Sequence, residues 1–407
     1  MIRFLTAGES HGKSLSVIIE GFPSNLPVDT DSINNDLRRR QSGYGRGGRM
    51  KIEKDRIEIL SGIRFGRTLG SPVSLLIKNN DWENWTEKMA HEGNGEGVEK
   101  VTIPRPGHAD LVGVQKYAFN DIRNSIERSS ARETAARVAA GSFAKELLKQ
   151  FGIKVVSFVE SIGGIDSPQN FTSAILENRM TGEEIVKLSA TADESELRVG
   201  DKSQEEKIIE LIKETKKSGD TLGGVFTTVA LNMPAGLGSF MHYDRRLDAK
   251  IASAFLSINA VKGVEIGNAF ENAGKPGSRV HDEIIVKNGI PERSTNRAGG
   301  TEGGVSTGMP LVVRAAMKPI STLMMPLKSI NLATMEGIEA RRERSDFVAV
   351  PACSVIGEAM LAWVIAEEMV IKFGGDSIGE MIRNYNSYMA ETGINIKNNF
   401  TEASDEN

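Results

Sequence analysis

The sequence predicts an α+β fold in which antiparallel sheets pack on central helices. Strand-like and helix-like segments are segregated in clusters along the 407 residues rather than strictly alternating, which favours α+β over a parallel α/β arrangement. The motif Gly-x-(Ser/Thr)-x-Gly also occurs four times, starting at Gly8, Gly66, Gly219 and Gly304, and a strand-like run follows each copy. Glycines before a strand permit positive φ angles and the close approach of another chain. Four such turns predict an internally duplicated β-rich unit, with chance recurrence of a short glycine motif as the alternative.

The first copy of the motif lies between two predicted strands, at residues 2–5 and 15–21. Residues 7–14 read AGESHGKS and fit the loose phosphate-loop pattern, whereas residues 8–12 fit the nucleophile-elbow pattern. Both patterns need a helix directly after the loop, and a phosphate loop uses the N-terminal amides of that helix to hold the anion. The run that follows is β-branched, ends in Gly-Phe-Pro and predicts a strand instead. We therefore interpret both matches as false.

Three helices are predicted between the strands. Residues 125–151 are rich in helix formers and stop at Gly152. Residues 244–261 carry apolar side chains at helical spacing, and residues 354–373 form a third helix that ends at Gly374. These segments are the predicted central layer.

The remaining segments complete a single predicted domain, residues 1–394. Strand-like runs after the other three glycine motifs read PVSLLIK, VFTTVALN and MPLVVRAAM. The charged segment 177–218 has a helical tendency and is predicted to be a surface insertion. The polar residues 395–407 are predicted to be a frayed C-terminal tail.

Composition excludes several classes of protein. An apolar share of 39% and a charged share of 26% are typical of a soluble globular protein, and no apolar run of about 18 residues predicts a membrane span. The N-terminus lacks the basic flank and apolar core of a secretory signal, so we expect a cytoplasmic location. The lone Cys353 excludes an internal disulfide, and its apolar neighbours predict a packed thiol. A net charge of −4 argues against general affinity for nucleic acid.

Two of the five histidines lie in glycine-containing loops. His11 follows Gly8, and His108 lies in the stretch RPGHAD. A single histidine is more often a surface or satisfied core residue than a catalytic one, although its pKa suits acid–base chemistry. Neither HxH nor HxxxH spacing occurs, so no metal site is predicted.

Cations gather in the glycine-rich stretch 38–51, which carries six of them in fourteen residues. The stretch is similar to RGG-type RNA-binding segments. Arginines in such a loop also suit a small phosphate or carboxylate through bidentate contacts, and a solvated charged loop is the third interpretation. Residues 128–132 and 318–322 mix hydroxyls with cations, and for each of them alone a capping or turn role is favoured.

Six motifs occur in order along the chain. They are GESHG at 8–12, the arginine–glycine loop 38–51, RPGHAD at 105–110, RSSARET at 128–134, SINAVKGVEIG at 257–267 and RSD at 344–346. Each motif alone is weak evidence for a family, but six motifs in this order are a specific pattern. Together they resemble the chorismate synthase family. The resemblance extends from Gly8 to Glu358. Ser345 and Phe347 depart from it, because many members have histidine and proline beside the aspartate.

The resemblance implies a shikimate-pathway lyase of aromatic amino acid biosynthesis, usually a homotetramer with a β-α-β sandwich core. Its substrate would be 5-enolpyruvylshikimate 3-phosphate, and its reaction an anti-1,4 elimination of phosphate to give chorismate. Reduced FMN would be required without net redox change. His11 and His108 would be the acid–base pair, and Asp346 would assist proton removal.

The resemblance also implies two sets of binding residues. The substrate's phosphate and carboxylates would be held by Arg40, Arg46, Arg49 and Arg132. FMN would be held by Arg128, Ser129, Ser130, Asn259, Ala260, Gly303, Lys318, Pro319, Ile320, Ser321, Thr322 and Arg344.

Two other classes of function remain open at this point. An RNA-binding protein would use residues 38–51 and show strongly salt-dependent binding of any polyanion. A phosphate-loop nucleotidase would use Lys13 and Ser14 and would need a following helix and magnesium. Some members of the family reduce their flavin with NADPH; because we recognise no reductase-like segment in the sequence, we expect an external flavin reductase.

Overall fold

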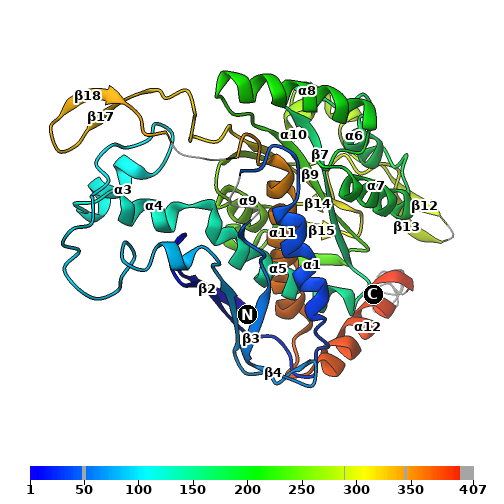
Figure 1. Cartoon of the computed structure of the whole chain (residues 1–407). Helices are drawn as coiled ribbons and strands as arrows, with labels where there is room; N and C mark the ends of the chain where they lie inside the picture. Colours follow the sequence, from blue (N-terminus) through cyan, green and yellow to red (C-terminus); the bar gives the residue numbers. More distant parts are fainter. Residues whose placement is uncertain (48–51, 288, 343–345, 395–407) are drawn as a thin grey trace.

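Two antiparallel sheets flank a central layer of helices in the computed structural model, which describes residues 1–47, 52–287, 289–342 and 346–394 (Figure 1). The first sheet has the order β1-β2-β6-β3 and the second the order β11-β16-β9-β7-β8. The first comprises Arg3–Ala7 (β1), Ser14–Glu20 (β2), Val73–Lys78 (β6) and Ile57–Ser61 (β3). The second comprises Val261–Ile266 (β11), Leu311–Met317 (β16), Gly224–Leu231 (β9), Lys154–Ile162 (β7) and Ile165–Asp166 (β8).

Four helices form the layer between the sheets. They are Thr30–Gln41 (α1), Thr134–Lys149 (α5), Leu247–Leu256 (α9) and Val350–Phe373 (α11). Helix α5 packs on the first sheet through β2, and α11 packs on the second through β7 and β9. The predicted α+β class, with antiparallel sheets on central helices, is therefore confirmed.

The two longest central helices, α5 and α11, approach each other closely. Gly141 of α5 faces the backbone of Ala359 in α11, and a Cβ atom on Gly141 would overlap with it. Nearly all of α11 is buried, including Cys353, whose pKa burial raises to about 12. Cys353 is thus the packed thiol that its apolar neighbours predicted.

All four strands predicted after the glycine motifs are present as β2, β6, β9 and β16. Strand β2 pairs directly with β1 in an antiparallel hairpin, so no helix follows residues 7–14. The phosphate-loop and nucleophile-elbow matches are false, as expected. Gly219, the start of the third motif, adopts the left-handed conformation (φ 75°) that ends the preceding helix.

The prediction of one continuous helix at 125–151 is wrong, because the segment is divided into three parts. The chain forms α4 (Arg123–Ser129), a 3-10 turn η2 (Ala131–Glu133) and then α5. Ser130 is extended (ψ 140°), and its hydroxyl accepts a hydrogen bond from the Arg132 amide. This serine cap offers the backbone an alternative to the helical ladder, so the segment bends where helix propensity alone predicted a straight run.

The other two predicted helices differ in their limits. Helix α9 is shorter than 244–261 because residues 243–245 form the 3-10 turn η3 (Tyr243–Arg245) and Val261 opens β11. Helix α11 begins at Val350 rather than at residue 354. Pro351 stands in its first turn, where a missing N–H costs nothing.

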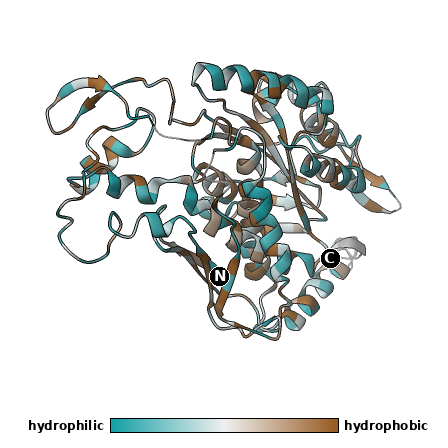
Figure 2. Cartoon of the chain, viewed as in Figure 1, coloured by the Kyte–Doolittle hydropathy of each residue, from teal (hydrophilic) through white to brown (hydrophobic). Residues whose placement is uncertain are grey.

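Residues 177–218 contain two amphipathic helices, Gly182–Glu194 (α7) and Lys202–Ser218 (α8). Their outward sides are mostly hydrophilic (Figure 2). Ile185 and Leu188 of α7 pack with Phe158 of β7 and Val229 of β9. This segment therefore covers the outer face of the second sheet.

The remaining elements lie around this core. The helical ones are Trp82–Asn84 (η1), Asp110–Tyr117 (α3), Phe171–Leu176 (α6), Ala269–Asn272 (α10), Gly277–Arg279 (η4) and Ile378–Ile394 (α12). The strands form three hairpins and a small sheet: Ile63–Arg64 (β4) with Arg67–Thr68 (β5), Ile284–Lys287 (β12) with Ile290–Arg293 (β13), Lys328–Asn331 (β17) with Glu336–Glu339 (β18), and Ala235–Gly238 (β10), Val305–Thr307 (β15) and Thr301–Glu302 (β14). None of the described helices is long and apolar enough to cross a membrane.

Candidate active site

The turn that carries His11 joins β1 to β2 and is fixed by hydrogen bonds from distant segments. The Ser10 amide donates to the carbonyl of Glu127 (3.0 Å). The side-chain amide of Asn79 donates to the carbonyls of Glu9 (3.2 Å) and Gly12 (2.6 Å). The turn is therefore held in one shape without a helix behind it.

The imidazole of His11 lies against a buried carboxylate. Its Nδ1 is 2.9 Å and 3.1 Å from the two carboxylate oxygens of Glu127, and the His11 amide donates to the same carboxylate (2.7 Å). The ring stacks on Trp85, with centroids 3.8 Å apart, and Arg123 donates to Glu127 (3.3 Å). Burial opposes ionisation of Glu127, but the hydrogen bonds and charge of His11 and the charge of Arg123 outweigh it and lower its pKa.

His108 has a similar carboxylate partner in its own loop. Its Nδ1 lies 2.5 Å from Oδ1 of Asp110, whose side chain is 1% exposed. Arg105 donates to Asp110 through its backbone amide (3.0 Å), Nε (2.8 Å) and Nη2 (3.0 Å). Burial opposes ionisation of Asp110, but hydrogen bonds from His108 and Arg105 lower its pKa well below the ordinary range. The side chains of both histidines remain 18% exposed.

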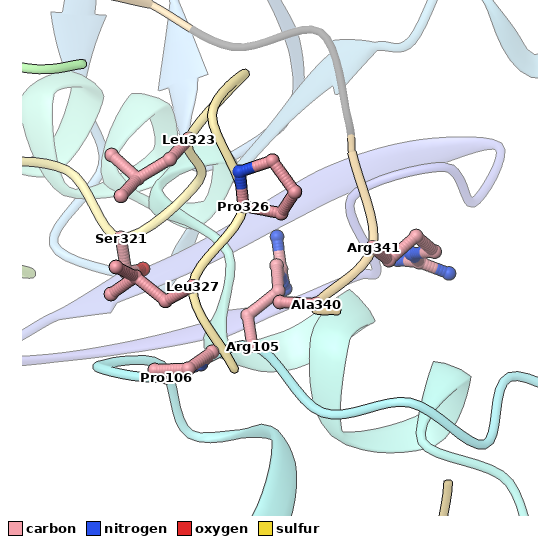
Figure 3. A pocket seen from close by; sticks show the side chains of 8 residues that line it. All are labelled: Arg105, Pro106, Ser321, Leu323, Pro326, Leu327, Ala340 and Arg341. Atoms are coloured by element: carbon pink, nitrogen blue, oxygen red, sulfur yellow. The ribbon is translucent and has the colours of Figure 1, made fainter. Parts of the chain in front are cut away.

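Residues 318–322 dock on the His108 loop. Lys318 Nζ donates to the carbonyl of Gly107 (2.6 Å), and Arg105 Nη1 donates to Thr322 Oγ1 (3.1 Å). A cavity of about 10 Å³ lies at this junction, which is room for about one water. Figure 3 shows its lining side chains, which are Arg105, Pro106, Ser321, Leu323, Pro326, Leu327, Ala340 and Arg341.

Two of the predicted substrate arginines share one buried aspartate. Arg40 Nη1 lies 3.2 Å from Asp55 Oδ2, and Arg132 Nη1 lies 2.6 Å from Asp55 Oδ1. Arg132 Nε also donates to Asn79 Oδ1 (2.9 Å), which ties it to the His11 turn. Each arginine is only 4% exposed, and burial lowers the pKa of Arg40 to about 10 against the attraction of Asp55. Both are thus placed beneath the His11 turn as an interlocked pair.

Arg46 and Asp346 form a second pair from distant parts of the sequence. Arg46 Nη1 lies 3.1 Å from Asp346 Oδ2, and the Gly47 amide donates to Asp346 Oδ1 (2.6 Å). The arginine–glycine loop therefore contacts the predicted catalytic aspartate. Arg49 and Arg344 lie outside the described residues.

Ser345 and Phe347 differ from the residues that many family members have beside the aspartate, and the structure describes Phe347. Ser345 lies outside the described residues. Phe347 donates its amide to the carbonyl of Gly45 (2.8 Å) and accepts a hydrogen bond from the Leu222 amide (2.9 Å). A proline at 347 would lack that donated N–H, so Phe347 adds a backbone tie next to Asp346.

Most of the predicted flavin residues are linked by contacts. Arg128 donates to the carbonyls of Gly8 (3.3 Å) and Thr6 (3.0 Å), and Asn259 Nδ2 donates to the carbonyl of Ser129 (3.0 Å). These contacts place the end of α4 and the residues after α9 beside the His11 turn. Ser130, which caps η2, lies in the same bend.

The contacts continue toward His108. The Lys318 amide donates to the carbonyl of Ala260 (2.9 Å), and Thr221 Oγ1 donates to the carbonyl of Ile320 (2.7 Å). Pro319 packs near Gly223 and Ser321 near Gly107. A continuous path of contacts therefore runs from the His11 loop through Asn259, Ala260 and Lys318 to the His108 loop.

Gly303 is not part of this path within the chain. It lies in the β14–β15 turn and contacts Phe240. The neighbouring Gly304 contacts Arg246 at the N-terminal end of α9, whereas Asn259 follows the C-terminal end. Ten residues of helix separate these ends by about 15 Å.

Sequence reasoning missed several polar residues of the site. Asp110 stands two residues after His108, and this His-x-Asp spacing was a readable signal. Glu127 directly precedes the RSSARET motif, but its pairing with His11 spans 116 residues. Asp55 and Asn79 lie in ordinary stretches and gave no local signal. The described residues contain no group of three or more His, Cys, Asp or Glu side chains that could hold a metal ion.

Comparisons with known proteins agree on one family. The sequence model of the family described as chorismate synthase matches residues 2–370. The chain is 54% identical to chorismate synthase of Aquifex aeolicus (strain VF5) over 390 residues, which cover 95% of this chain and 97% of that one. It is 53% identical to chorismate synthase of Chlorobaculum tepidum over 393 residues, 96% of this chain and 98% of that one. A solved structure described as "Crystal Structure of Chorismate Synthase" superposes with a TM-score of 0.78 at 44% identity, over 96% of this chain and 98% of the other.

Proposed function

The chain belongs to the chorismate synthase family, and from this premise we propose that it eliminates phosphate from 5-enolpyruvylshikimate 3-phosphate to give chorismate. The elimination is anti-1,4 and uses reduced FMN without net change of redox state. The path of contacts between the His11 and His108 loops is the observation that carries this proposal. It links the two histidine loops through Arg128, Asn259 and Lys318, and cations and hydroxyls along such a path suit a substrate with one phosphate and two carboxylates.

The residues along the path have the chemistry to hold FMN. Arg128, Lys318 and the hydroxyls of Ser129 and Ser130 suit a phosphate group. Asn259 Oδ1 is buried and accepts no hydrogen bond within the described part of the chain, so an acceptor is available there for a ligand N–H. When bound, reduced FMN supplies an electron-rich ring system that favours phosphate expulsion. Gly303 and Arg344 complete the proposed set, with Gly303 outside the path described above.

The side chains of the protein are proposed to bind the substrate and to transfer protons. Arg40, Arg46 and Arg132 orient the anionic groups of the substrate, and Arg49 is proposed to join them. His11 and His108 hold and donate protons at Nε2, because Nδ1 of each lies against a carboxylate. A proton delivered to the leaving phosphate lowers the cost of its developing charge.

Asp346 is proposed to assist removal of the ring proton. Its carboxylate is oriented by Arg46 and by the Gly47 amide. These two donors hold the carboxylate in one orientation, from which it can accept a proton from a bound substrate.

Several wider properties belong to the same proposal. We propose a cytoplasmic homotetramer that acts on a small molecule without nucleic-acid or membrane partners and receives electrons from an external flavin reductase rather than from NADPH directly. We also propose that the two sheets arose by duplication. Strands β2 and β6 are neighbours in the first sheet and β9 and β16 in the second, which supports that origin.

Anaerobic turnover with a fixed, substoichiometric amount of photoreduced FMN tests the proposed function. Phosphate release and flavin absorbance are followed together. Many phosphates per flavin, with the reduced spectrum restored, are expected because the elimination changes no oxidation level overall. One flavin oxidised per product, or full activity without flavin, would contradict the proposal.

Replacing Arg46 by Ala is expected to raise the KM for the substrate roughly tenfold to a hundredfold. The change removes charge-assisted hydrogen bonds, each of which contributes about 1.5–3 kcal/mol. Steady-state phosphate release measures it. Arg38→Ala is the matched control, since Arg38 is exposed on α1 and its guanidinium donates to the neighbouring Asn35. Equal loss of RNA binding in both variants, with normal KM, would favour an RNA-binding protein.

A further inference from the structure

We propose that Glu127 is a positioning residue that fixes the tautomer and orientation of His11. This inference rests on the proposed function and assigns a role to a residue outside the motifs that identify the family. Glu127 lies on α4 and is separated from His11 by 116 residues, yet it contacts both the backbone and the ring of that histidine.

Glu127 restrains both the backbone and the imidazole ring of His11. One oxygen, Oε2, accepts the His11 amide at 2.7 Å and thereby fixes the turn. Both oxygens lie within 3.1 Å of Nδ1 and thereby fix the ring, whose other side stacks on Trp85 at 3.8 Å between centroids. The imidazole is therefore clamped along its edge and across its face.

The protonation of the pair follows from the chemistry of a carboxylate. The side chain of Glu127 is 2% exposed and lies 3.3 Å from the guanidinium of Arg123. Arg123 and the His11 donors favour the ionised form, which can only accept hydrogen bonds. Nδ1 must then carry the proton in this contact, so proton exchange with a ligand takes place at Nε2.

Two further histidine–carboxylate pairs show how burial distinguishes the contact between Glu127 and His11. His108 and Asp110 repeat the arrangement with a carboxylate that is 1% exposed and is bound by Arg105. His242 and Asp244 have a comparable Nδ1–Oδ1 distance of 2.7 Å, but their side chains are 57% and 61% exposed. Water screens the exposed pair, whereas burial and a bound arginine make the two proposed acid–base pairs specific.

Glu127→Gln separates positioning from a purely structural role. The glutamine has the same shape and keeps one acceptor oxygen for the His11 amide, so the turn holds. Its NH₂ group then faces Nδ1 and favours the tautomer protonated at Nε2. We expect kcat to fall roughly tenfold to a hundredfold while KM changes less than about threefold, as for a group that orients a general acid.

The conservative variant and a matched control complete the kinetic test. Glu127→Asp keeps the charge and is expected to recover a large part of the kcat lost in Glu127→Gln. Asp244→Asn alters the exposed histidine–carboxylate pair and is expected to leave kcat unchanged. Wild-type kcat in Glu127→Gln, or equal losses of kcat and thermal stability in both Glu127 variants, would overturn the proposal.

A spectroscopic measurement tests the tautomer of His11 independently of enzyme activity. Nitrogen-15 NMR of the full-length chain labelled at its five histidines reports which ring nitrogen is protonated, and a His11→Gln spectrum assigns the signal. A protonated Nδ1 is expected in the wild type and an unprotonated Nδ1 in Glu127→Gln; an unchanged Nδ1 signal would overturn the proposal. If the wild type released no phosphate from the substrate, the proposed function would fail while this measurement still tested the Glu127–His11 pair.

Discussion

Replacing His108 by Ala is expected to lower kcat for phosphate release by roughly a hundredfold to ten-thousandfold, the usual contribution of an acid–base group. The same loss is expected for His11→Ala. Each variant removes the group whose Nε2 we propose to handle a proton, but it leaves the arginines that bind the substrate. KM is therefore expected to change much less than kcat.

Pre-steady-state phosphate release under anaerobic conditions measures the effect of the histidine variants directly. His91→Ala is the control, because the His91 side chain is 90% exposed and lies 3.7 Å from the similarly exposed Glu92. Thermal melting should show that all three variants remain folded. Near-normal kcat in both His11→Ala and His108→Ala would remove these residues from the mechanism.

Replacing Glu358 by Gln is expected to lower the free energy of unfolding by about 3–5 kcal/mol, the scale for breaking a buried ion pair from one side. Glu358 is 1% exposed on α11 and lies 2.7 Å from both Arg39 Nη2 and Lys145 Nζ. Arg198 and the hydroxyl of Ser157 also donate to it, at 3.2 Å and 2.7 Å. Glutamine would remove the negative charge that the buried Arg198 and the part-buried Arg39 and Lys145 share.

The destabilisation should depend on pH in a defined direction. Burial opposes ionisation of Glu358, but the charges of Arg39 and Lys145 outweigh it and hold its pKa well below the ordinary value. A carboxylate with a depressed folded-state pKa stabilises fully above its unfolded pKa, about 4.3, and loses that contribution as pH falls. The gap in unfolding free energy between wild type and Glu358→Gln should therefore shrink below about pH 4.

Urea denaturation at pH 7 and at about pH 3 measures that gap. Glu336→Gln, in the exposed strand β18, provides the control and should change the free energy of unfolding by less than about 0.5 kcal/mol. A Glu358→Gln protein within 1 kcal/mol of wild type at pH 7 would show that the surrounding groups compensate one another.

Local patterns predicted the strands well and the helix limits less well. Alternating and β-branched runs after glycine turns predicted β2, β6, β9 and β16, because side-chain periodicity is a local property. The break at Ser130 depends on one hydroxyl that accepts the Arg132 amide. Propensity averaged over many residues cannot resolve a single cap of this kind.

The site was predicted residue by residue only where family motifs marked it. His11, His108, Arg46 and Asp346 all stood in such motifs, and the structure gives each of them a charged partner. The partners Glu127 and Asp55 could not be read from the sequence. Their roles arise from contacts across 116 and 77 residues, and the sequence alone does not encode distance in space.

The shared aspartate beneath the His11 turn has a consequence for product release. Arg40 and Arg132 already bind Asp55 before any ligand arrives. A phosphate that binds these arginines must compete with the Asp55 carboxylate for their N–H groups. Its net binding free energy is then the difference between the arginine–phosphate and the arginine–carboxylate interactions. If these arginines bind phosphate as proposed, Asp55 would be an internal competitor that shortens the residence of an inorganic phosphate product after each turnover.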